Sequence, residues 1–351
     1  MTNPTEPSAR ERRRRHRGRR FLVWTVIVAA ILWCGYWYAA SRIAEAGIGR
    51  FTTALAGSGR SVSCTEGGMS GFPLRLDLRC TDGRLDAGTD GISAALKGAS
   101  ASALLYQPGY VETAVTGPLA LNSPALGGNV TAVWQEATLK VDAGISGLVS
   151  AIGNLSGFSL VPEVETVTLP LKQLTLKSGS FRLGPAGNGD YRIDANATDL
   201  AMARSTGPAF PPISTEVSVV AARFGSSTGL DPEKTLQNWV AAGGGIRVEN
   251  LALHSGDISL AATGKLALAP TGYLSGRLAL TVTGMEKLPD LAEALKPGSR
   301  EKMTQVVGMV SSFMKPVDGG NGAREIDLLV QNGVIFAGMF PLPFVIPPVR
   351  F

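Results

Sequence analysis

The chain has 351 residues, of which 44% are apolar and 17% charged, and this composition excludes an intrinsically disordered protein. Its formal net charge of +5 comes from residues 1–20, which hold eight arginines and two glutamates. The remainder carries 25 basic and 26 acidic residues, which excludes the broad basic face that a nucleic-acid-binding domain needs, so we expect no nucleic-acid partner.

Residues 21–40 form an uncharged apolar run that directly follows the basic residues 1–20. A helix of about 20 residues spans the hydrocarbon core of a bilayer, so the run predicts a transmembrane helix. The excess of arginine before the span predicts a cytoplasmic N-terminus and an exported body, because positive charge stays inside. We expect a single-pass anchor in a bacterial inner membrane, with a periplasmic body. A cleaved signal peptide is the alternative, because Ala44-Glu45-Ala46 resembles a cleavage site. Aromatic residues typical of a membrane interface lie near the ends of the run, at Trp24, Trp33, Tyr36, Trp37 and Tyr38.

Residues 41–60 are expected to connect the membrane to a folded domain at residues 61–351. Ile43, Gly47, Phe51 and Leu55 recur with helical spacing, which predicts an amphipathic stalk helix. Glycine lowers helix propensity, so an extended stalk is the alternative.

Two of the three cysteines, Cys64 and Cys80, lie in the part that is expected to be exported. No histidine lies between them to complete a zinc site, and an oxidising compartment favours disulfide formation. The spacing therefore predicts a structural disulfide, with free thiols as the alternative. Before the second cysteine, Leu74, Leu76 and Leu78 alternate with charged residues, which predicts a half-buried antiparallel strand.

The rest of the body contains more than a dozen further strand-like segments separated by Gly, Asn, Asp and Pro. An apolar-x-apolar-x-Asp/Ser/Asn-Gly pattern predicts hairpin turns at Gly83, Gly179, Gly256 and Gly333. Its recurrence indicates either a duplicated unit, with the domain built of two halves, or an ordinary meander. The predicted fold is mainly β, with a minor α+β component. It consists of the transmembrane helix followed by a large antiparallel, hairpin-rich curved sheet or sandwich with a few accessory helices.

Helical segments are few. Residues 231–245 begin with an Asp-Pro pair and end in glycines, which predicts one short helix. Residues 285–315 predict a helical pair in which Ser299 caps the second helix. This pair is expected either to pack on the sheet or to form a lid or partner-binding helix.

The sequence lacks the usual signatures of catalysis. It contains no Gly-x-Ser-x-Gly, no phosphate-binding loop, no HExxH and no Cys-x-x-Cys. We therefore expect a protein that is not an enzyme, with no cofactor and no metal.

One stretch is more specific than composition: Gly71-Phe72-Pro73-Leu74-Arg75-Leu76-Asp77-Leu78. With the basic tail, the single span and the proline-rich C-terminus, it resembles an uncharacterised family of Gram-negative bacterial proteins. The resemblance implies an anchor in the inner membrane and a periplasmic body, and it supplies no activity. More loosely, the layout is similar to AsmA-like envelope proteins, whose β-sheet grooves are associated with lipid traffic. The residues that carry this family motif are Gly71, Phe72, Pro73, Arg75 and Asp77.

Two functions fit these patterns. In the first, an apolar sheet groove binds a phospholipid or another envelope lipid. In the second, the protein is a tethered scaffold that binds a periplasmic protein, for example by adding a strand at a sheet edge.

Overall fold

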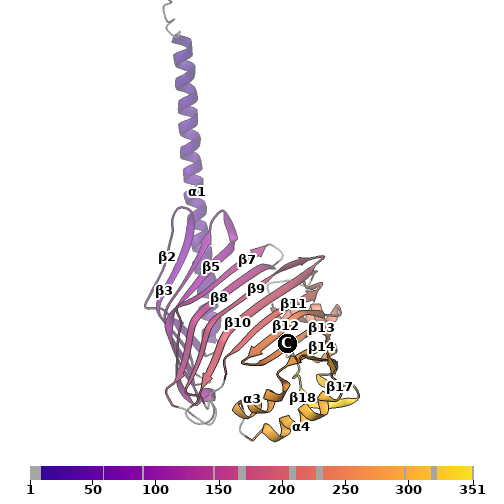
Figure 1. Cartoon of the computed structure of the whole chain (residues 1–351). Helices are drawn as coiled ribbons and strands as arrows, with labels where there is room; N and C mark the ends of the chain where they lie inside the picture. Colours follow the sequence, from indigo (N-terminus) through magenta and orange to yellow (C-terminus); the bar gives the residue numbers. More distant parts are fainter. Residues whose placement is uncertain are drawn as a thin grey trace, which may run out of the picture.

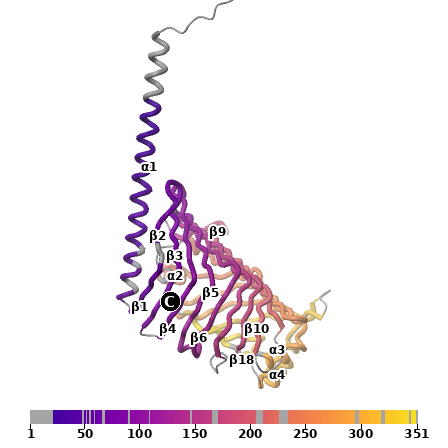
Figure 2. The backbone as a smooth tube through the Cα atoms, turned by 90° about the vertical axis from the view of Figure 1, so that its left-hand side faces the viewer, coloured from indigo at the N-terminus to yellow at the C-terminus, as the bar shows by residue number. Residues whose placement is uncertain are grey.

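A computed structural model shows one long helix followed by a single antiparallel sheet (Figure 1). The sheet has 18 strands and is curved, and α1 runs along its first edge (Figure 2). A mainly β fold with an N-terminal apolar helix is therefore confirmed, and of the two predicted forms it is a curved sheet rather than a sandwich. The structure describes residues 9–57, 59–88, 91–144, 147–164, 171–204, 211–226, 232–295, 298–317 and 322–349.

The first element, α1, is one helix from Ala9 to Gly57. Its part from Phe21 to Gly47 is long and apolar enough to span a membrane, and most of its side chains are exposed, with Ser41 as a buried exception. The helix continues through Gly47 and Gly49, so the span and the predicted stalk form one element. A cost of about 1 kcal/mol per glycine is small against the continuous hydrogen bonding of so long a helix.

The strands form a meander, because nearly every one pairs with a neighbour in the sequence. β1 and β2 both pair with β3, and the ladder then passes through β4 to β5. β5 pairs with β6 and β7, and both of these pair with β8. From β8 the order follows the sequence to β14, and β16, β17 and β18 complete the sheet. The pairings run continuously through the described strands, and a duplication of the domain stays a prediction.

The bounds of the strands are these. In the first part of the chain they are β1 Arg60–Ser63, β2 Glu66–Ser70, β3 Arg75–Ala87, β4 Ile92–Leu104, β5 Gln107–Ser123, β6 Gly128–Val133, β7 Glu136–Gly144, β8 Gly147–Pro162 and β9 Gln173–Gly187. In the second part they are β10 Asp190–Ala203, β11 Ile213–Ala222, β12 Gly245–Ser255, β13 Ile258–Leu268, β14 Leu274–Thr283, β15 Lys315–Pro316, β16 Arg324–Gln331, β17 Val334–Ala337 and β18 Phe340–Val345.

Two of the four predicted hairpin turns are turns. Gly256 lies between β12 and β13, and Gly333 lies between β16 and β17; both have positive φ. The predictions at Gly83 and Gly179 are wrong, because these residues lie inside β3 and β9. At Gly83 the pairing of β3 with β4 continues before and after the glycine, and at Gly179 the pairing of β9 with β10 does the same. Both glycines therefore lie within continuous long strands. A Cβ at Gly83 would lie 3.3 Å from the Cys80 sulfur, and one at Gly179 would lie 3.2 Å from a Leu176 methyl.

Helices α2 (Pro232–Ala241), α3 (Leu288–Leu295) and α4 (Arg300–Ser311) lie where the sequence predicts them. Single 3-10 turns lie at Pro124–Leu126, Phe224–Ser226 and Met285–Lys287. The Ser299 side chain does not cap α4 and instead donates to the Ala292 carbonyl at 2.6 Å. The Glu293 carboxylate accepts from the backbone N–H groups of Gly298 and Arg300 and takes over the capping role.

A disulfide joins Cys64 to Cys80, as the sequence predicts. It connects the segment between β1 and β2 to the middle of β3, at the same edge of the sheet along which α1 lies. Cys34 is a free, exposed thiol in α1.

Candidate functional site

The most extended feature of the sheet is a row of apolar residues that crosses thirteen strands. Residues directly opposite each other in antiparallel strands have side chains on the same face. The row therefore lies on one face of the sheet, which we call the apolar face. Its members are Leu76, Ala103, Val111, Val141, Ala151, Leu183, Ile193, Val219, Val248, Gly264, Leu278, Leu328 and Ala337.

A second row is apolar except for one threonine and lies two residues along each strand, or three on β12, where a β-bulge adds one residue. Because side chains alternate between faces, this row shares the face of the first. Its members are Leu78, Ala101, Thr113, Leu139, Gly153, Phe181, Ala195, Val217, Leu251, Ala262, Leu280 and Ile326.

The residues between these rows point to the opposite face, and from β3 to β12 the row aligned there is polar except for Ile152. The register aligns Asp77, Ser102, Glu112, Lys140, Ile152, Arg182, Asp194, Ser218 and Asn250. An antiparallel sheet with one apolar and one polar face normally packs its apolar face on something and exposes the other to water.

Charged groups on the polar face pair across the strands. Lys140 lies 2.9 Å from the Glu112 carboxylate, and Tyr110 donates a hydrogen bond to the same oxygen. These contacts lower the pKa of Glu112, with the hydrogen bond from Lys140 as the main cause. Farther along, Arg192 lies 2.6 Å from Glu249 and lowers the pKa of that carboxyl. These pairs stabilise both charged partners on the exposed face, and they leave the apolar face without charge along its two rows.

Protein covers the apolar face on its C-terminal strands. Val282, Ile326 and Leu328 are buried there against residues of α3, α4 and the segments beside them, including Met314, Val310 and Leu288. Toward the other end of the same strands, α2 places Trp239 and Val240 against Ile246, Leu268 and Leu274. Of the two alternatives predicted for the helical pair at residues 285–315, packing on the sheet is therefore the one that the structure shows.

The described part of the chain provides less cover on the strands before β11. Phe181 is 42% exposed and Ile193 37% exposed, although both lie in the apolar rows. Leu251, on β12, is 41% exposed and lies between the two helical caps. Large apolar side chains on a face of a sheet are normally buried, so this region is the candidate binding surface.

The residues of the family-like motif form the corner between β2 and β3. Gly71 has a φ of +99°, and a Cβ there would lie 2.8 Å from the Arg75 carbonyl oxygen, so only glycine fits. The Phe72-Pro73 peptide bond is cis. Asp77 accepts a hydrogen bond from Ser102 at 2.6 Å, and Arg75 lies 3.9 Å from the same carboxylate oxygen. The motif thus builds a tight corner and fastens it to β4.

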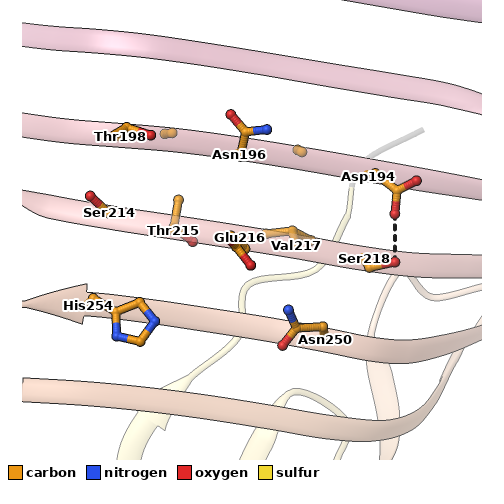
Figure 3. A pocket seen from close by; sticks show the side chains of 12 residues that line it. Asp194, Asn196, Thr198, Ser214, Thr215, Glu216, Val217, Ser218, Asn250 and His254 are labelled. Carbon is orange, nitrogen blue, oxygen red and sulfur yellow. Dashed lines mark hydrogen bonds between the residues drawn. The ribbon is translucent and has the colours of Figure 1, made fainter.

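A depression of about 490 Å³ lies on the polar face over β10, β11 and β12 (Figure 3). Its polar groups engage one another: Ser218 donates to Asp194 at 2.7 Å, and Asn196 donates to Ser180. His254 lies at one end, as an exposed side chain. The depression is open to solvent, and its polar side chains already bond to one another or to neighbouring strands, so it is a weaker candidate than the apolar face.

Sequence reasoning identified apolar strands but missed the alignment of their side chains into two rows. The signal was present as strict alternation in segments such as 74–80 and 99–103, but only the register shows that the rows join. It also interpreted Trp33, Tyr36 and Trp37 as residues at a membrane interface, without the contacts that they make with the motif corner.

Comparisons with known proteins give one result. No curated protein and no solved structure matches the chain, so the expected similarity to AsmA-like proteins stays a prediction. A family described as an uncharacterised protein conserved in bacteria, DUF2125, matches residues 37–344, which include the motif corner and nearly the whole sheet. On the extent of that match, the chain belongs to the bacterial family DUF2125.

Proposed function

We propose that this protein is a membrane-anchored envelope protein that binds the acyl chains of lipids on the apolar face of its sheet. The observation that carries the proposal is the pair of apolar rows across twelve and thirteen strands, whose members on β9, β10 and β12 include side chains that are more than one third exposed. Burial of apolar surface is worth about 25 cal/mol per Å², so a ligand with long hydrocarbon chains gains most from such a face.

The cargo follows from the chemistry of the face. The two rows offer branched, aromatic and small apolar side chains, and they offer no charge. Small residues such as Ala101, Ala103 and Ala195 leave space between larger neighbours, which suits flexible chains better than one rigid group. A lipid head group would remain in water, beyond the ends of the rows or near the charged residues at the edges.

The location is part of the proposal. The span from Phe21 to Gly47 supports a single-pass anchor, and the arginines before it support a cytoplasmic N-terminus. The body then lies in the bacterial periplasm, attached to the inner membrane. The disulfide between Cys64 and Cys80 agrees with this, because disulfides persist in oxidising compartments. On this proposal the protein handles lipid and performs no covalent chemistry.

Site-specific photocrosslinking of the full chain in bacterial cells tests the proposal. The photoreactive residue p-benzoyl-phenylalanine is placed at position 181, 193 or 251, one variant for each exposed side chain of the apolar face. Matched controls carry it at Arg182 and Asn196, which are exposed on the polar face of the same strands. We expect lipid adducts, identified by mass spectrometry, from the apolar-face positions and none from the two controls.

Two results would overturn the proposal. One is a set of apolar-face variants that cross-link no lipid, or no more than the controls do. The other is efficient cross-linking of positions 181 and 193 to one discrete protein, which would support the tethered scaffold instead. The apolar face would then be a protein interface.

A further inference from the structure

Two hairpin ends lie against the membrane-spanning part of α1. The first is the β2–β3 corner at residues 71–75, and the second is the β4–β5 turn at residues 104–107. We call them the two tips. The tips of β2–β3 and β4–β5 point along α1 toward its N-terminal end (Figures 1 and 2). The Phe72 ring packs edge-on against Trp37, with ring centroids 5.5 Å apart.

Three aromatic side chains of α1 donate hydrogen bonds to backbone carbonyls of the tips. The Trp33 indole donates to Pro73 at 2.7 Å and the Trp37 indole to Arg75 at 2.9 Å. The Tyr36 hydroxyl donates to Leu105 at 3.1 Å. Within the tips, the N–H of Arg75 donates to Gly71, and the N–H of Leu105 donates to Leu74. Backbone groups that a turn normally leaves to water are therefore paired inside the protein.

This pairing matters because of its position along the helix. Trp33 lies twelve residues after Phe21, about 18 Å along an α-helix, and Trp37 lies about 24 Å along it. The hydrocarbon core of a bilayer is about 30 Å thick. If it begins at Phe21, directly after the last arginine of the basic segment, both tryptophans lie within it or at its far boundary. Non-helical backbone is tolerated at that depth only where its polar groups are satisfied within the protein.

The outward surface of the tips is apolar and uncovered. Phe72 is 56% exposed, Leu74 53% and Tyr106 65%. The first charged residue beyond the corner is Arg75, and on α1 the first charged residues after the span's aromatic cluster are Arg42 and Glu45, which pair at 3.1 Å. Apolar and aromatic side chains at the extremity with charge behind them match the order of hydrocarbon and head groups in a bilayer.

We propose that the two tips insert into the leaflet of the same bilayer that α1 leaves, as a second membrane contact of the sheet. Leu74 precedes Leu76, the first member of the longer apolar row, by two residues in the same alternating run. The inserted tips thus bring the beginning of the apolar face to the level of the acyl chains. The occupant of this surface is a phospholipid bilayer.

Site-directed spin labelling of the full chain in phosphatidylcholine nanodiscs tests this inference. In a Cys34→Ala background, single Phe72→Cys, Leu74→Cys and Tyr106→Cys variants are labelled. The control is Met339→Cys, whose side chain is 90% exposed in the turn between β17 and β18, far along the sheet. Collision with oxygen reports contact with hydrocarbon, and collision with a water-soluble nickel complex reports contact with water.

We expect labels at positions 72, 74 and 106 to collide several-fold more with oxygen, relative to nickel, than the label at position 339. Equal ratios at the tip positions and at 339 would overturn the inference. Recovery of the Cys64–Cys80 disulfide in each variant, measured by mass spectrometry, shows that β3 has folded. Positions 74 and 106 keep the test valid if the variant at 72, whose ring packs on Trp37, disturbs the corner. The spin labels report contact of the tips with the bilayer and the photocrosslinks at position 181 report occupancy of the face, so either proposal can fail alone.

Discussion

The C-terminal strands and the middle strands of the apolar face differ in how far their side chains are buried. Ile326, Leu328 and Ala337, in the C-terminal strands, are buried under α3, α4 and neighbouring segments. Phe181 and Ile193, in the middle strands, carry equivalent side chains on the same face and are more than one third exposed. Apolar side chains alternate with polar ones in both regions, so the apolar face is suited to packing against other apolar groups along its whole width. Helices of the chain supply that contact on the C-terminal strands, whereas Phe181 and Ile193 stay more exposed, and this contrast separates a structural core from a binding surface.

Truncation of one side chain in each region tests the contrast most strongly. We expect Leu328→Ala to lower the free energy of unfolding by about 2–5 kcal/mol, because it leaves a cavity under the helices. Phe181→Ala removes a larger side chain from an exposed site and should cost less than about 1 kcal/mol in lipid-free protein. Denaturant unfolding of the full chain in detergent measures both. Equal losses would remove the distinction between core and surface.

Removal of the disulfide tests what holds the N-terminal edge, where no described helix covers the rows. Closing a loop of this length contributes about 3 kcal/mol on the chain-entropy model. A Cys64→Ala/Cys80→Ala variant should lose stability of that order. We also expect faster hydrogen exchange in β1–β3 than in β14–β17, measured by mass spectrometry. A uniform change across the sheet would indicate that the two regions unfold as one unit.

Two glycines that lie in the apolar rows give a matched pair. A Cβ at Gly264 would lie 2.2 Å from the Arg277 carbonyl oxygen, and its φ is +156°. A Cβ at Gly153 would lie 2.2 Å from the Phe181 ring, which is exposed and can move aside. Gly264→Ala should therefore cost about 2–3 kcal/mol and Gly153→Ala less than about 1 kcal/mol. Thermal unfolding midpoints of the two variants provide the comparison, and the reverse order would contradict it.

The smallest expected effect concerns pH and the corner between α3 and α4. Hydrogen bonds from the backbone N–H groups of Gly298 and then Arg300 lower the pKa of Glu293 below its ordinary value of 4.5. A carboxyl with a lowered pKa stabilises the fold above its ordinary pKa, and this contribution is lost as pH falls through the lowered one. Between pH 7 and pH 3, wild type should lose slightly more stability than Glu293→Gln does. Parallel pH profiles of the unfolding midpoint would contradict this role.

The sequence predicted individual strands and helices better than the register and the long-range contacts between them. Leu74, Leu76 and Leu78 predict β3 by alternation alone, because the period of a strand is local. Asp82-Gly83 has the composition of a turn, yet β3 continues, because Leu96 and Gly98 of β4 keep their partners on either side. Ser299 was expected to cap α4, but its hydroxyl donates to the Ala292 carbonyl, and a carboxylate of the preceding helix accepts from the first N–H of α4 instead. The two rows and the tip contacts depend on register and on residues about 40 positions apart, such as Trp33 and Pro73, which no local pattern contains.

The meander has a consequence for how such a chain can change in length. From β9 to β13 each strand pairs only with the strands before and after it in the sequence. Loss or duplication of one complete hairpin would therefore leave every other pairing and the alternation of side chains intact. Each two-strand step would change the width of the apolar face by about 10 Å, since neighbouring strands lie about 4.8 Å apart. The width of the apolar face can thus grow or shrink in units of one hairpin, while the membrane anchor and the helical caps stay unchanged.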